Sequence, residues 1–232
     1  MTAAARILGV DAAKRGWAVA EIVSSAVKLS VDTFLDEMVA EASPGLIAID
    51  APIGLPTRYE RGGRACELQA RKLIGPRRSS VFATPPRDIV GMSGRRYDEV
   101  AAAMRERRGV GLSQQSFAIH PRIREVDALV RRLGQSRVVE VRPEFCFFVR
   151  NGRSPLFHSK KVPEGLEQRR RLLESAFGPL RFEQPQGAQM DDCLDAIAAL
   201  WTARRVANGQ PARLPTEGSP VDGCGLRMEM WA

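Results

Sequence analysis

The sequence predicts an α/β protein built around a mixed sheet, and three observations lead to this fold class. Residues 6–11 (RILGVD) and 46–50 (LIAID) are short apolar segments that end in an aspartate, which is typical of buried strands. Residues 16–23 and 27–33 alternate between apolar and polar positions, as half-buried antiparallel strands do. The later strand segments are separated by segments long enough for helices, which favours parallel pairing there.

The first half of the sheet is predicted to be an antiparallel meander. Its three strands cover 6–11, 16–23 and 27–33, and a helix over 35–41 follows. The strand at 46–50 then ends sharply at the segment APIGLP, because its two prolines cannot continue a central strand.

A basic insertion is predicted at about 58–134, between the fourth and fifth strands. It is rich in arginine and interrupted by Gly and Pro, and its helices are expected at 62–74, 96–108 and 119–133. The segment GPRRSSVFATPPRD between the first two of these helices is expected to be a loop.

Regular α/β alternation resumes after the insertion. A buried strand is expected at 137–141, and helices are expected at 164–177 and 189–207. We therefore expect one domain over residues 1–210, followed by an irregular Pro/Gly-rich tail over 211–232.

The composition indicates a soluble, cytoplasmic protein with an anionic partner. Of the 232 residues, 44% are hydrophobic and 27% are charged, which is ordinary for a globular domain. The net charge of +8 favours a polyanion such as nucleic acid, although an arginine-rich solvated surface is the alternative. No signal peptide, membrane span or C-x-x-C pair is present, so we expect no membrane, reduced cysteines and no zinc site. The oligomeric state stays open, with a homodimer as one option.

Two aspartates end the apolar strand segments. Asp11 follows the first strand and Asp50 follows the fourth. Ligands of open α/β sheets bind outside the carboxyl ends of the strands, so both residues are candidate site residues. An aspartate that only terminates a strand in a turn is the alternative for either residue.

The segment MDDCLDAIAAL at 190–200 adds a second group of acids. Asp192 and Asp195 are three residues apart, and Asp191 and Asp195 are four apart, so each pair shares one helix face. Such oxygen donors suit Mg²⁺ or Mn²⁺. The alternative is an acidic first turn that complements the helix dipole.

These motifs together resemble one bacterial family. GVDAAKRGWAVAEI, AIDAPIGLP, RACELQARKLIGPRRSSVFATPPRD, VVEVRPEFCFF, the SKK at 159–161 and DDCLDAIAALWTA occur in the order seen in the predicted nucleases of RNase H-like fold that carry the domain of unknown function numbered four-two-nine. The resemblance covers about residues 6–207. The D-x-x-D-A motif of the last helix is also similar to that of Holliday-junction resolvases.

The resemblance implies a fold and a set of metal ligands. The fold is RNase H-like, with three antiparallel strands, parallel strands and helices on both faces. Asp11 would be the first ligand, Asp50 or Glu140 the second, and Asp192 with Asp195 the last. The family's fifth-strand motif has a histidine where this chain has Arg142, so no imidazole acts there. Glu144 is a further candidate ligand, or else an acid at the start of a helix.

The activity implied is hydrolysis of a phosphodiester by two Mg²⁺ or Mn²⁺ ions, with Asp11 bridging them. The phosphate backbone would be held by basic residues, which are Lys160, Lys161, Arg64, Arg71, Arg77 and Arg78. The insertion has few aromatic residues, so we expect no extensive stacking of bases.

Two other functions compete with the nuclease. The chain could be a non-catalytic nucleic-acid-binding protein of the same fold, which would bind nucleic acid without binding metal. GVDAAKRGW also loosely resembles the phosphate loop of actin-like phosphotransferases. That architecture needs two such domains, and this chain is too short and lacks a glycine-rich nucleotide motif.

Overall fold

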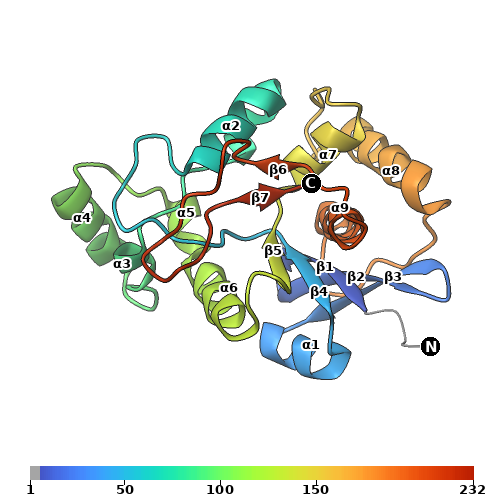
Figure 1. The fold of residues 1–232 in the computed structure, drawn as a ribbon, viewed down its shortest axis with the longest axis horizontal. Coiled ribbons are helices and arrows are strands. Elements are labelled where there is room, and N and C mark those ends of the chain that lie inside the picture. Colours follow the sequence, from blue (N-terminus) through green and yellow to red (C-terminus); the bar gives the residue numbers. More distant parts are fainter. Residues whose placement is uncertain (1–5) are drawn as a thin grey trace.

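A five-stranded mixed sheet forms the centre of the protein (Figure 1). The computed structural model describes residues 6–232. The strand order across the sheet is β3-β2-β1-β4-β5, and the strands are β1 (Ile7–Ala13), β2 (Gly16–Val23), β3 (Ala26–Asp32), β4 (Leu46–Ile49) and β5 (Val138–Glu140). The α/β class predicted from the sequence is confirmed.

The sheet changes from antiparallel to parallel at its centre. β2 pairs antiparallel with both β1 and β3, whereas β4 pairs parallel with both β1 and β5. The carboxyl ends of β1, β4 and β5 therefore lie along one edge of the sheet, where the sequence places acidic residues.

Helices cover both faces of the sheet (Figure 1). Helix α9 (Met190–Ala207) lies against one face, with α7 (Pro143–Arg150) and α8 (Pro163–Phe177) packed beside it. Several strand residues in the same core as α9 are small, among them Ala18, Ala20 and Ala48, which are completely buried. Small side chains let the helix lie close to the strands.

The opposite face is covered by α1 (Leu35–Ala42) and α6 (His120–Leu133). Leu8 and Val10 of β1 share a core with Val126 and Leu129 of α6. The insertion expected at 58–134 included this helix, but its apolar side belongs to the core of the sheet. The structure therefore assigns α6 to the main α/β layers.

The remaining helices between β4 and β5 divide between the main core, which includes Cys66, Ala70 and Ile74 of the first of them, and a smaller core of their own. They are α2 (Ala65–Ile74), the 3₁₀ helix η1 (Gly75–Ser80), α3 (Arg87–Val90), α4 (Tyr97–Arg108) and α5 (Gln114–Ala118). Ile89, Val100, Met104 and Leu112 form the buried centre of one part. The expected loop at 75–88 contains η1 and the start of α3, since GPRRSS closes a short helical turn.

The C-terminal tail, predicted to be irregular over 211–232, has two short strands and otherwise no regular secondary structure, but it is bonded to the rest of the fold. β6 (Arg213–Leu214) and β7 (Met230–Trp231) pair antiparallel, and Trp231 forms a parallel bridge with Val141. Asp222 accepts a hydrogen bond from the backbone N–H of Leu55 at 2.9 Å. These contacts fasten the tail to the end of β5 and to the segment after β4, contacts that no local pattern in the tail reveals.

Two expectations from the composition can be compared with this fold. All four cysteines are free thiols, and Cys66, Cys146 and Cys193 are buried, as predicted. Over residues 6–232, the helices are all too short or too polar to cross a membrane.

Candidate functional site

The close approach of α9 to β1 creates the candidate site. A Cβ atom on Gly9 would lie 2.0 Å from the backbone nitrogen of Leu200 and 2.2 Å from the carbonyl oxygen of Ala196, so only glycine fits there. Side chains two residues apart on a strand share a face. Asp11 therefore points to the same side as Gly9, toward the helix that carries Asp195.

Asp11 lies among the other predicted acids. Its side chain is buried, and its pKa is raised well above the ordinary value by burial and then by the charges of Asp195 and Asp50. Asp192 raises the pKa of Asp11 further, whereas Lys160 lowers it. We call Asp11, Asp50, Asp192 and Asp195 the acidic cluster. They come from β1, the end of β4 and α9, and the tertiary structure brings them into mutual electrostatic range.

Asp195 is the helix acid buried beside Asp11. Its side chain is 2% exposed and accepts a hydrogen bond from the Nζ atom of Lys160. Burial raises the pKa of Asp195 to about 7 even though the Lys160 ammonium opposes the shift. Asp11 and Asp195 are both buried and interact electrostatically, so ionisation of both is costly without a cation.

Asp192 and Asp191 have different partners. Asp192 is half-buried and accepts a hydrogen bond from the backbone N–H of Gln189 at 2.9 Å, which caps the start of α9. Asp191 is buried and pairs with the Nζ atom of Lys161 at 2.6 Å. The spacing of Asp191 and Asp195 had indicated their common face, but Asp191 was not among the predicted site residues.

The two lysines predicted to hold phosphate form ion pairs with acids of α9 in this structure. Lys160 contacts Asp195 and is also 3.7 Å from Asp191, while Lys161 is 64% exposed beyond its contact with Asp191. They come from the loop between α7 and α8. This loop therefore supplies positive charge to the edge of the acidic cluster.

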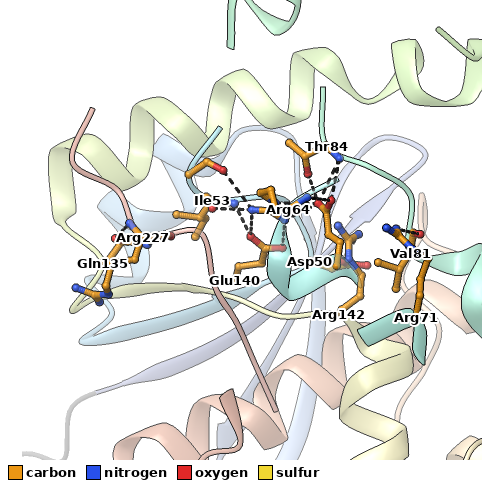
Figure 2. Close-up of polar contacts among 12 residues, drawn as sticks. Asp50, Ile53, Arg64, Arg71, Val81, Thr84, Gln135, Glu140, Arg142 and Arg227 are labelled. Atoms are coloured by element: carbon orange, nitrogen blue, oxygen red, sulfur yellow. Dashed lines mark hydrogen bonds and ion pairs between the residues drawn. The ribbon is translucent and has the colours of Figure 1, made fainter. Parts of the chain in front are cut away.

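Asp50 is paired with Arg142, which follows β5. The Nη1 atom of Arg142 donates a hydrogen bond to Asp50 at 2.9 Å (Figure 2). Burial opposes the charge of Arg142, but Asp50 and then Glu140 raise its pKa above the ordinary value. Asp50 is therefore the member of the acidic cluster whose carboxylate is paired with the Arg142 guanidinium.

Glu140 and Arg64 form a buried ion pair instead of the roles predicted for them. Arg64 donates to both carboxylate oxygens of Glu140 at 2.8 and 2.6 Å, and the N–H of Ile53 donates to the same carboxylate (Figure 2). Arg64 also pairs with Glu67, which accepts from Thr84. With both side chains completely buried, Arg64 is enclosed away from any phosphate, a correction to the sequence-based assignment. Glu140 has its oxygens taken by these donors.

The other predicted site residues of this region are Glu144, Arg71, Arg77 and Arg78, and they differ in how far they are exposed to solvent. Arg169 donates to both oxygens of Glu144 at 2.8 Å, so this acid too has a structural partner. Arg71 is half-buried and donates to the carbonyl of Val81. Arg77 is 22% exposed, and Arg78 is exposed to solvent. Of the four arginines predicted to hold phosphate, Arg77 and Arg78 thus remain accessible.

The acidic cluster fits a divalent cation in the kind of donor it offers. Carboxylate oxygens are the ligands that Mg²⁺ and Mn²⁺ prefer, and a cation would relieve the repulsion that raises the pKa of Asp11. In the arrangement described for residues 6–232, no three His, Cys, Asp or Glu side chains lie close enough to hold one ion. The cation next to Asp195 is the ammonium of Lys160.

Comparison with known proteins gave one family. The family model described as "Protein of unknown function (DUF429)" matches residues 9–219. This range includes the insertion, α9, every residue of the acidic cluster and all of the sheet except the first two residues of β1. The comparisons with curated proteins and with solved structures gave no match.

Proposed function

We propose that this chain, which belongs to the DUF429 family of proteins of unknown function, is a divalent-metal-dependent nuclease of RNase H-like fold. The observation that carries the proposal is that Asp11 and Asp195 are both buried where β1 meets α9, with the charge of Asp195 acting on Asp11. Buried carboxyls whose pKa values are raised by their neighbours are typical of functional sites.

The topology supports the proposed fold. The strand order β3-β2-β1-β4-β5, with three antiparallel strands followed by two parallel ones, is the arrangement that the family resemblance implies. The acids also lie where that resemblance expects them, on the first strand, after the fourth strand and on the last helix.

Each residue of the site has a proposed task. Asp11 and Asp195 would hold the metal, with Asp50 and Asp192 as further oxygen donors. A bound ion would supply a water of lowered pKa and stabilise the leaving oxygen. Arg77 and Arg78 would bind phosphates of the backbone. Lys160 and Lys161, once a metal replaces them on the acids, would be available to neutralise further phosphates.

The test is cleavage of labelled nucleic acids by the purified protein. Single-stranded and duplex RNA and DNA, an RNA–DNA hybrid and a four-way junction would each be incubated with Mg²⁺ or Mn²⁺. Asp11→Asn should abolish cleavage while the fold is retained, because neutralising one of several like charges does not destabilise the cluster. Asp36→Asn is the matched control, since Asp36 is 79% exposed on α1, on the opposite face of the sheet. A wild-type protein inert on every substrate with both metals would refute the nuclease.

One observation favours a second candidate, a non-catalytic nucleic-acid-binding protein. The Lys160 ammonium already neutralises Asp195 without a metal, and the described acids do not form a three-ligand site. Titration calorimetry with Mn²⁺ separates the two candidates. The nuclease requires metal binding that Asp11→Asn abolishes, whereas the binding protein would retain nucleic acid in the presence of a chelator and show no heat with Mn²⁺.

A further inference from the structure

A small pocket lies in the insertion between β4 and β5. Its lining includes the rings of Tyr59 and Phe82, the apolar side chains of Met104 and Leu112, and Ser113. The cavity volume is about 200 Å³. Sites that enclose a whole drug-sized ligand measure roughly 300–1,000 Å³. This pocket therefore suits one flat ring system and leaves the rest of a ligand outside.

The ring of Phe82 connects the pocket to the acidic cluster through one side chain. The guanidinium of Arg142 lies 5.2 Å from the centroid of the Phe82 ring. The same guanidinium donates to Asp50 (Figure 2), and the charge of Asp50 acts on Asp11. Arg142 therefore links this wall of the pocket to Asp50 of the acidic cluster.

The lining has the chemistry that recognises a nucleobase. Aromatic rings such as those of Tyr59 and Phe82 stack on a base irrespective of its sequence. The hydroxyls of Ser113 and Ser116 can each donate or accept a hydrogen bond at a base edge.

We propose that this pocket seats one unpaired base of a nucleic acid whose adjoining phosphate lies at the acidic cluster. The protein would then select single-stranded or locally unpaired nucleic acid over a continuous duplex, because a paired base cannot leave its stack without a cost. This inference rests on the proposed function and specifies its substrate class. The sequence had shown few aromatic residues and no extensive stacking, and the structure gathers two of them into a place for one base.

The experiment uses a single-stranded oligonucleotide that contains 2-aminopurine, a base whose fluorescence is quenched by stacking. Binding to the full-length protein is measured without added metal, so that cleavage does not interfere. Wild type should quench the fluorescence and should bind the single strand more tightly than the matched duplex. Phe82→Leu should weaken binding of the single strand about tenfold and remove the quench. Phe34→Leu is the control, since Phe34 is 55% exposed at the start of α1.

A second variant separates binding from folding. Tyr59→Leu changes the other ring of the pocket, and both variants should melt at the temperature of the Phe34→Leu control. Equal affinity of wild type for single strand and duplex, or an unchanged quench in both pocket variants, would overturn the inference. Cleavage by wild type without any quench leaves the nuclease standing and removes the pocket. Quenching by wild type without cleavage under any metal would leave the base pocket standing and remove the nuclease.

Discussion

Gly9→Ala tests whether the close contact of β1 and α9 holds the site together. The added Cβ would lie 2.0 Å from the nitrogen of Leu200 and 2.2 Å from the oxygen of Ala196, whereas ordinary van der Waals contact begins at 3.4 Å. Strand and helix would have to separate by about 1.4 Å, the difference between the first and last of these distances. The obstructing atoms belong to the backbone, so no side chain can rotate away.

The expected cost follows from this overlap. Overpacking a core costs typically 1–3 kcal/mol, and rigid backbone atoms place this case near the upper end, at about 3 kcal/mol. With a urea dependence of roughly 3 kcal/mol per molar, the unfolding midpoint should fall by about 1 M. The separation should also move Asp195 away from Asp11, so metal-dependent cleavage should be lost even below the unfolding transition.

Urea denaturation followed by circular dichroism measures the change, with Gly111→Ala as the control. A Cβ atom on Gly111 would have no other atom within 4 Å, so this alanine should leave the midpoint unchanged or slightly higher. A Gly9→Ala midpoint equal to that of wild type would refute the reasoning, because it would mean that α9 does not lie against β1 at this point.

Three further predictions concern charge. The pKa of Asp11 is raised, so the stability it contributes is fully present below its ordinary pKa of 3.8 and is lost as pH rises through the folded-state value. Asp11→Asn should therefore raise the melting temperature relative to wild type, more at pH 8 than at pH 5, and a lower value at pH 8 would show that Asp11 is a structural acid. Lys160→Met should tighten Mn²⁺ binding by about tenfold in calorimetry, because the variant lacks the ammonium that competes with the metal for Asp195. The control is Lys28→Met, since Lys28 is exposed. Equal Mn²⁺ affinity in the two variants would contradict this role of Lys160. Reversing Arg77 and Arg78 to glutamate should weaken nucleic-acid binding and reduce its salt dependence, by about 0.9 in slope for each phosphate that is no longer neutralised; a slope equal to that of wild type would favour a plain solvated surface.

Local patterns located most elements well. The strand predicted at 16–23 has those bounds in the structure, and the helices predicted at 96–108 and 189–207 begin one residue later than expected. Hydrophobic period and proline placement are local properties, so the chain alone reveals them. Helix α7 was not predicted as an element, although Glu144 had been considered as an acid at the start of a helix, because its residues 143–148 are all buried and show no helical alternation of apolar and polar positions.

For the candidate site, the sequence located the acids of the cluster but not the partners of the charged residues around it. Asp11, Asp192 and Asp195 were chosen from their positions at the end of a strand and the start of a helix, and the structure brings them into electrostatic range of one another. Arg64 and Glu140 were chosen as a phosphate ligand and a metal ligand, yet they bind each other across 76 residues of sequence. A motif indicates that a charged residue matters, but it does not reveal which opposite charge it meets.

The order of apolar, alternating and helical segments was thus sufficient for the α/β class and for the places where acids interrupt the core. The partners of those acids depend on which segments the fold packs together. Lys160 reaches Asp195 from the loop before α8, Arg142 reaches Asp50 from the end of β5, and the tail reaches Leu55 from the far end of the chain. A buried charge must find a partner wherever packing places one, and that choice belongs to the tertiary structure because the two members of each pair are distant in sequence.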